Sequence, residues 1–194
     1  MFQQFPTEKP CYKPDPAGWF SGDNKKVFGS ILKNSKCKTI VELGAWLGKS
    51  TRWFLDRPTT EVVYTIDTWE GSKEHEGQEI LRHVYSKFLV NCWDYQERLF
   101  HIKDTTLNGL DFLKAEQVEP DFIYVDASHE YEDVLCDLEK AYSLFPKAIL
   151  TGDDWNWKNW DEGKQKTVKL ATQEFARRHR FGIYASKTAW VILK

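Results

Sequence analysis

The chain has 194 residues, with 27 Lys and Arg against 29 Asp and Glu, and a formal net charge of −2. This length predicts one domain, and the balanced charge argues against binding to nucleic acid or to a membrane surface. The four cysteines lie far apart and form no C-x-x-C pair, which argues against a structural zinc site and a disulfide framework. Because no apolar run reaches membrane-spanning length and no signal peptide is visible, we expect a cytoplasmic protein.

The N-terminal residues predict an irregular arm. Four prolines and little periodicity occur before residue 18, so we expect an arm over 1–20 and a single domain over 21–194. Ser21 and Asp23 are candidate caps for a helix from about Asn24 to Lys33.

Strand and helix patterns then alternate along the chain. Expected strands cover 39–43, 61–67, 98–103, 121–126, 147–151, 181–185 and 189–193, and expected helices cover 49–56, 77–91, 107–115, 131–143 and 162–179. This alternation predicts an α/β fold, with a mostly parallel seven-stranded sheet that carries helices on both faces. The last two strands lack an intervening helix, so they predict a C-terminal hairpin with one antiparallel strand. Ligands of such sheets bind at the carboxyl ends of the strands.

The first strand leads into a glycine turn. Gly44 and Gly48 bracket the turn, Glu42 precedes it, and Ser50 and Thr51 open the next helix. Glycines and free helix N–H groups suit a nucleotide, but the spacing is not the dinucleotide fingerprint. An acid beside the turn would repel a pyrophosphate and suits a positively charged ligand such as S-adenosylmethionine. The alternative is an ordinary βα turn of an α/β fold.

The second expected strand ends in a carboxylate. Asp67 follows Glu42 by 25 residues, which is close to the spacing at which a strand-end acid meets a ribose. A carboxylate at this position can accept both ribose hydroxyls. Alternatively, Asp67 caps the turn that follows.

Three motifs resemble the class I S-adenosylmethionine-dependent methyltransferases. The segment 42–50 looks like that of catechol O-methyltransferase and its small-molecule relatives, whereas 66–71 and 121–131 resemble the methyltransferase-24 and macrocin-type families. The resemblance runs from about Phe28 to the end of the chain. It implies a Rossmann-like class I methyltransferase fold, and S-adenosylmethionine contacts from Glu42, Gly44, Ala45, Trp46, Gly48, Ser50, Asp67, Thr68, Trp69, Asp104, Thr105 and Asp126.

Some of these contacts have a second interpretation. By resemblance, Asp104 and Thr105 frame the adenine, but a threonine here would also cap the helix over 107–115. The two roles are compatible. Trp69 is expected to lie against the adenine or to close the pocket.

Three aspartates follow the fourth and fifth strands. Asp126, Asp153 and Asp154 should converge, which is unfavourable unless a cation neutralises them. Oxygen ligands suit Mg²⁺, Mn²⁺ or Ca²⁺, and the resemblance implies that these three residues bind such a metal. The metal would hold a substrate hydroxyl and lower its pKa. Alternatively, Asp153 and Asp154 cap a loop while Asp126 contacts only the cofactor, as in a metal-free enzyme.

His129 lies three residues after Asp126, where the catechol enzymes carry a lysine base. We expect Asp126 and His129 to be catalytic, with His129 as a general base, although a metal-ligand or structural role stays open. Trp19, Phe20 and the Trp-rich segment 155–160 are candidates for a wall of the substrate site, or they pack the loops onto the sheet.

These features predict a metal-assisted O-methyltransferase that acts on a small-molecule or sugar-like hydroxyl. One alternative is a metal-free methyltransferase with His129 as base, and another is a cofactor-binding module without turnover. Many relatives form dimers, so a homodimer is also expected.

Overall fold

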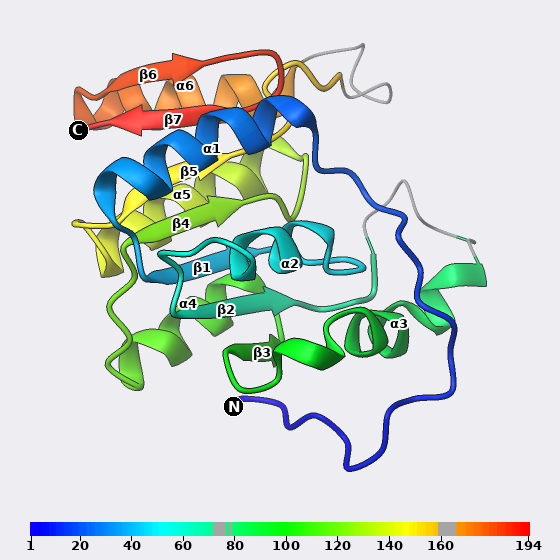
Figure 1. Cartoon of the computed structure of the whole chain (residues 1–194). Helices are drawn as coiled ribbons and strands as arrows, with labels where there is room; N and C mark the ends of the chain where they lie inside the picture. The colour runs from blue at the N-terminus through cyan, green and yellow to red at the C-terminus, as the bar shows by residue number, and fades with distance from the viewer. Residues whose placement is uncertain (72–76, 78, 159–165) are drawn as a thin grey trace.

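A seven-stranded sheet forms the centre of the molecule (Figure 1). The computed structural model describes residues 1–71, 77, 79–158 and 166–194. The strand order is β3-β2-β1-β4-β5-β7-β6. The strands are β1 Thr39–Leu43, β2 Val62–Asp67, β3 Leu99–Lys103, β4 Phe122–Val125, β5 Ile149–Gly152, β6 Gly182–Ala185 and β7 Trp190–Leu193.

The pairing confirms the predicted mixed topology. Strands β1 to β5 pair in parallel, whereas β7 is antiparallel to both β5 and β6. The register aligns Leu43 with Ile66 on one side and with Val125 on the other. The carboxyl ends of β1, β2 and β4 therefore meet at one edge of the sheet.

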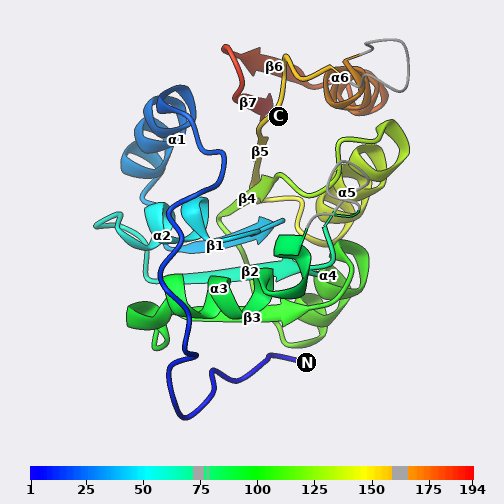
Figure 2. The same cartoon turned by 90° about the vertical axis from the view of Figure 1, so that its right-hand side faces the viewer.

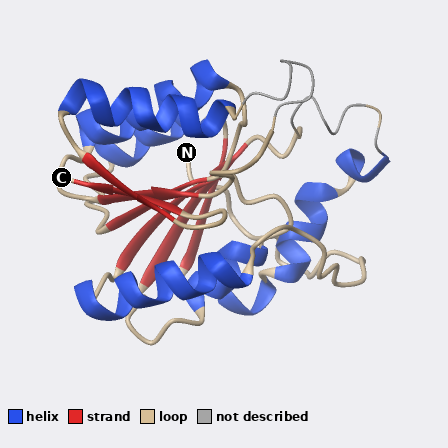
Figure 3. Cartoon of the chain, turned by 90° about the horizontal axis from the view of Figure 1, so that it is seen from above, coloured by secondary structure: helices blue, strands red, loops and turns tan. Residues whose placement is uncertain are grey.

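Helices cover both faces of the sheet, as Figure 3 shows. They are α1 Gly22–Ser35, α2 Lys49–Leu55, α3 Val84–Asn91, α4 Thr106–Ala115, α5 Tyr131–Leu144 and α6 Thr167–His179, with 3₁₀ turns η2 Glu79–Arg82 and η3 Trp93–Tyr95. Phe28, Phe54 and Phe88 from α1 to α3 pack in one core cluster. Leu110, Leu138 and Phe175 from α4 to α6 pack in another.

Side chains that alternate along each strand contribute to both core clusters. In β1, Ile40 joins the cluster under α1 to α3, whereas Val41 and Leu43 join the cluster under α4 to α6. Successive side chains of a strand point to opposite faces, so one apolar run can build two cores.

Three expected helices differ in detail. The helix expected over 77–91 is divided into η2 and α3, with His83 between them at φ −131°. The helix expected over 162–179 begins at Thr167 among the described residues, and 162–165 lie outside them. Helix α1 is longer than expected because Ser21 caps it, accepting a hydrogen bond from the Asn24 N–H at 3.2 Å.

The N-terminal segment packs on the domain. Gln3 forms a bridge with His101 of the edge strand β3, and the Phe2 ring lies 4.9 Å from that of Phe112. Figure 2 shows the segment running from beside β3, in front of α3 and α2, to the start of α1. The division into an arm over 1–20 and a domain over 21–194 stays a prediction. None of the described helices has the length and apolar character needed to cross a membrane.

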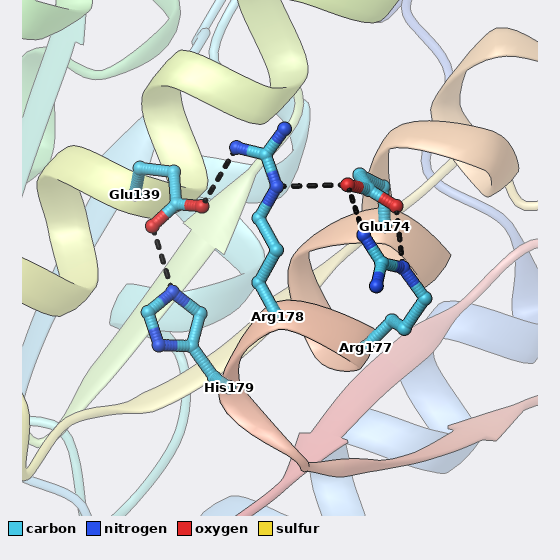
Figure 4. Close-up of polar contacts among 5 residues, drawn as sticks. All are labelled: Glu139, Glu174, Arg177, Arg178 and His179. Atoms are coloured by element: carbon cyan, nitrogen blue, oxygen red, sulfur yellow. Dashed lines mark hydrogen bonds and ion pairs between the residues drawn. The ribbon is translucent and has the colours of Figure 1, made fainter.

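The basic cluster near the end of α6 is paired with acids of the same fold (Figure 4). Glu174 bonds Arg177 and Arg178, and Glu139 of α5 bonds Arg178 and His179. These contacts join α5 to α6. They give the basic cluster an intramolecular role.

Candidate active site

A cavity of about 1230 Å³ opens at the carboxyl edge of the sheet. The turn after β1 and the loops after β2, β3, β4 and β5 all contribute to its lining, and Gly18 and Trp19 of the N-terminal segment lie at its border. Open α/β sheets bind ligands at this edge, so the cavity is the candidate active site.

The glycine turn forms one wall of the cavity. Gly44 has φ +88°, and a Cβ there would lie 2.1 Å from the Asp126 backbone oxygen. Gly48 has φ +75°, and its Cβ would lie 2.5 Å from the Cys92 Sγ. Both positions therefore require glycine. Gly44, Ala45, Trp46 and Ser50 line the cavity as expected, whereas the lining among described residues leaves out Gly48.

Asp67 lines the cavity and also fixes the glycine turn. Its Oδ2 accepts hydrogen bonds from the N–H groups of Ala45 and Trp46, both at 2.8 Å, and its Oδ1 accepts one from the Trp69 N–H at 2.6 Å. A carboxylate has about four lone-pair positions, and three are occupied. Asp67 therefore holds the turns on both sides of it, and its expected contact with a ribose stays a prediction.

Glu42 lies beneath the cavity. Its side chain is fully buried and accepts hydrogen bonds from the hydroxyls of Ser50 and Thr51 at 2.5 Å. Burial raises the pKa of Glu42 to about 7. Strand β1 turns this side chain under α2, so Glu42 is not among the described residues that line the cavity, and its expected contact with the cofactor stays a prediction. Glu42 instead holds the start of α2, of which Ser50 reaches the cavity.

The loops after β2 and β3 line the next part of the cavity. Thr68, Asp104 and Thr105 all contribute to its lining. Thr105 also caps α4 by accepting from the Asn108 N–H, so the capping interpretation holds. Hydrogen bonds from Asn108 and Thr105 hold the pKa of Asp104 below its usual value.

Trp69 belongs to the core. Its side chain is 2% exposed, packs on the rings of Tyr85 and Phe88, and donates from Nε1 to the Trp46 carbonyl at 3.0 Å. The expected contact between Trp69 and an adenine is therefore not supported, because the ring faces α3 instead of the cavity.

Asp126, His129 and Asp154 meet at the cavity. One ligand atom from each lies within 4.8 Å of the other two. His129 Nε2 lies 2.7 Å from Asp154 Oδ2, and Tyr124 donates its hydroxyl to Asp126 Oδ2 at 2.8 Å. Burial, followed by the charges of Asp153 and Asp154, raises the pKa of Asp126 well above its usual value.

Asp153 lines the same cavity with a different set of contacts. Its Oδ2 accepts a hydrogen bond from Asn24 Nδ2, whereas its buried Oδ1 has no hydrogen-bond partner among the described residues. Burial and the charge of Asp154 raise its pKa. The geometry therefore groups His129 with Asp126 and Asp154, where the sequence had grouped Asp153 with them.

This donor set fits a divalent cation. Burial and neighbouring carboxylates raise the pKa of Asp126 and of Asp153, and the buried Asp153 Oδ1 has no hydrogen-bond partner among the described residues, so a cation would relieve the crowding of negative charge. Several carboxylate oxygens with one imidazole nitrogen suit Mg²⁺ or Mn²⁺.

Three residues of the site were not identified from the sequence. Tyr124 lies two residues before Asp126, which places both on one face of a strand. Asp137 lines the cavity, accepts from the Thr106 hydroxyl at 2.5 Å, and has a pKa raised to about 7 by burial. The sequence did contain a signal for Asp137, because it is an acidic residue at a position of α5 that faces the core. Asn24 gave none, because its partner is distant in the chain.

Two of the candidate wall aromatics reach the cavity. The Trp157 ring stacks on His129 with centroids 4.5 Å apart, and Trp19, 73% exposed, lies 6.4 Å from Trp46. Phe20 is buried in the core cluster under α1 to α3, and Trp155 packs against the other cluster, under α4 to α6. Trp160 lies outside the described residues.

A family profile described as a methyltransferase domain matches residues 41–155. This stretch contains the glycine turn, Asp67 and the acidic cluster, by which we mean Asp126, Asp153 and Asp154. A comparison with curated protein sequences gives no significant match.

Solved structures share the fold at low sequence identity. An O-methyltransferase from Bacillus cereus in complex with SAH is 20% identical, with 96% of this chain and 84% of that chain covered and a TM-score of 0.59. The O-methyltransferase TomG from Streptomyces achromogenes, in complex with SAM, is 14% identical, with coverages of 91% and 82% and a TM-score of 0.63. MycE from the mycinamycin pathway, in complex with Mg, SAH and mycinamycin VI, is 14% identical, with coverages of 87% and 48% and a TM-score of 0.60.

Proposed function

This chain belongs to the methyltransferase domain family and is an S-adenosylmethionine-dependent methyltransferase, and from this premise we propose that it methylates a hydroxyl group with the help of a divalent cation. The acceptor is a small molecule or a sugar-like group. The observation that carries the proposal is the convergence of Asp126, His129 and Asp154 on the cavity beside the glycine turn.

The cofactor would occupy the part of the cavity formed by the first three strand ends. Gly44, Ala45, Trp46, Asp67, Asp104 and Thr105 line this part, where Asp67 would accept a ribose hydroxyl and Asp104 and Thr105 would lie at the adenine end. The bound cofactor supplies an electrophilic methyl group on a positively charged sulfur. The protein contributes placement, because a methyl displacement depends on the alignment of the two reactants.

The acidic cluster prepares the acceptor. Asp126 and Asp154 would hold the cation, and a bound cation would lower the pKa of the acceptor hydroxyl. Tyr124 fixes the Asp126 carboxylate with a hydrogen bond at 2.8 Å, and the stacked Trp157 orients the His129 ring. His129 either completes the cation site or accepts the hydroxyl proton.

A metal-free reaction is the second candidate, and the contact between His129 Nε2 and Asp154 Oδ2 favours it. At 2.7 Å this contact is a hydrogen bond that orients an imidazole, which suits a general base. In this variant of the mechanism Asp154 stabilises the imidazolium and holds no cation.

The MycE complex, which contains Mg, SAH and mycinamycin VI, supports a small-molecule acceptor and a cation together. We extend both to this chain as part of the proposal. A homodimer and a cytoplasmic location stay predictions, as does the expected lack of binding to nucleic acid and membranes.

An assay of S-adenosylhomocysteine formation against a panel of hydroxyl-bearing acceptors tests the proposal. We expect EDTA to abolish turnover, Mg²⁺ or Mn²⁺ to restore it, and Asp126→Asn to lower kcat/KM by at least about 100-fold. Glu139→Gln, on the α5 surface away from the cavity, should retain activity. Full activity in EDTA together with inactivity of His129→Ala would instead establish the metal-free mechanism.

A further inference from the structure

Asn24 connects α1 to the acidic cluster. It lies in the first turn of α1, is 0% exposed, and donates from Nδ2 to Asp153 Oδ2 across 129 positions of sequence. It also lies outside residues 41–155, which the family profile covers. A fully buried amide whose donor faces a carboxylate of the site requires an explanation.

The orientation of this amide is fixed from its other end. Thr188 donates its hydroxyl to Asn24 Oδ1 at 2.7 Å, and Ser21 donates to the same oxygen at 3.1 Å. A carboxylate accepts hydrogen bonds whereas a hydroxyl can also donate, so the NH₂ group faces Asp153 and the amide oxygen faces the two hydroxyls. Thr188 of the β6–β7 hairpin makes the shorter of the two bonds and is therefore the main contact that keeps the donor turned toward the carboxylate.

Asp153 is held at its backbone as well. Trp190 donates from Nε1 to the Asp153 carbonyl at 2.7 Å. With the carbonyl and Oδ2 both occupied, Oδ1 is the carboxylate atom left over. It is buried, has no partner among the described residues, and belongs to a side chain that lines the cavity.

We propose that Asn24 is a positioning residue that holds the Asp153 carboxylate beside the group of Asp126, His129 and Asp154, with its Oδ1 kept free to act in cation binding. This inference rests on the cation role proposed above. A carboxylate with one oxygen hydrogen-bonded and the other free is oriented before the cation arrives. Without Asn24, the carboxylate can turn both oxygens away from the site.

Titration of the full-length protein with Mn²⁺, followed by electron paramagnetic resonance, tests this role. Asn24→Leu removes the donor with little change in volume, and we expect it to weaken Mn²⁺ binding by about 10- to 100-fold. The affinity for S-adenosylhomocysteine, measured by calorimetry, should stay within about twofold of the wild type, because Asn24 does not line the cavity. Asn24→Ala serves as a second variant should the leucine not fit.

Ser21→Ala is the matched control. It removes the cap of the same helix and one contact to the amide oxygen, but leaves Thr188 and the donor to Asp153 in place. We expect it to lower the melting temperature while Mn²⁺ affinity stays close to the wild-type value. A purely structural role for Asn24 would make the two residues behave alike.

The remaining outcomes separate the inference from the proposed function. Wild-type Mn²⁺ affinity in folded Asn24→Leu would overturn the positioning role alone. A wild-type protein that binds S-adenosylhomocysteine but no Mn²⁺ would overturn the cation role and this inference with it. Failure to bind S-adenosylhomocysteine at all would overturn the proposed function.

Discussion

Glu42 shows how a single buried residue can hold the backbone of the site in place. Its carboxyl group is fully buried and bonded to Ser50 and Thr51 in the first turn of α2. Burial favours the protonated form and raises its pKa from 4.5 to about 7. The residue thus fixes the glycine turn at a cost in stability that depends on pH.

The sign of this dependence follows from proton linkage. Between about pH 4.5 and pH 7 the unfolded chain has released the Glu42 proton while the folded chain retains it, so stability falls as the pH rises through this window. Glu42→Gln removes the titration. We expect the variant to gain stability relative to the wild type across the window, by on the order of 3 kcal/mol in total, and no further above it.

Urea denaturation at intervals of half a pH unit measures the effect. Glu116→Gln, on the surface, controls for the chemistry of the substitution. Parallel stability curves for wild type and Glu42→Gln would contradict the raised pKa.

At the scale of elements, the glycine turn connects β1 to α2 and also contacts the ends of β2 and β4. Gly44 donates its N–H to the Ile66 carbonyl of β2, and its Cα faces the Asp126 backbone. The turn, the end of β2 and the end of β4 are therefore built as one unit. A side chain at Gly44 would separate them.

Gly44→Ala tests this unit. The added Cβ would lie 2.1 Å from the Asp126 oxygen, at a φ of +88° that alanine rarely adopts. We expect a loss of at least about 2 kcal/mol in stability and loss of S-adenosylhomocysteine binding. Gly22→Ala is the control, since a Cβ there meets nothing within 4 Å and α1 should gain slightly from alanine. Equal behaviour of the two variants in denaturation and calorimetry would contradict the role of Gly44.

The sequence predicted the elements better than it predicted the directions of side chains. Strand ends could be placed, so Asp67, Asp126 and Asp154 were correctly expected at one edge of the sheet. Glu42 and Trp69 were expected there too, but the direction in which each side chain leaves the backbone turns them into the core. Pattern alone does not fix that direction at a strand end or in a tight turn.

Contacts between segments that are distant in the sequence were the other feature that could not be predicted. The link from Asn24 to Asp153 depends on how α1 docks beside the β6–β7 hairpin, which local sequence does not encode. His129 could be assigned to the motif, but its joining with Asp126 and Asp154 depends on the fold.

At the scale of the whole molecule, the N-terminal segment extends from the outer strand of the sheet to the active-site cavity. Gln3 pairs with β3, Asp15 is bonded by Lys87 and Asn91, and Gly18 accepts from Lys49 Nζ at 2.6 Å. Asn91 also donates to the Leu47 carbonyl of the glycine turn. The segment therefore protects an edge strand and borders the cavity with the same stretch of chain.

The central claim is that one cavity binds an S-adenosylmethionine-type cofactor beside a divalent-cation site. Calorimetric titration of the EDTA-treated protein with S-adenosylhomocysteine, and separately with Mg²⁺ and Mn²⁺, tests it most directly. We predict micromolar binding of S-adenosylhomocysteine and a separate binding heat from the metal, which Asp126→Asn removes. Metal heat that persists in Asp126→Asn would contradict the cation site, and the absence of S-adenosylhomocysteine binding under all conditions would contradict the cofactor assignment.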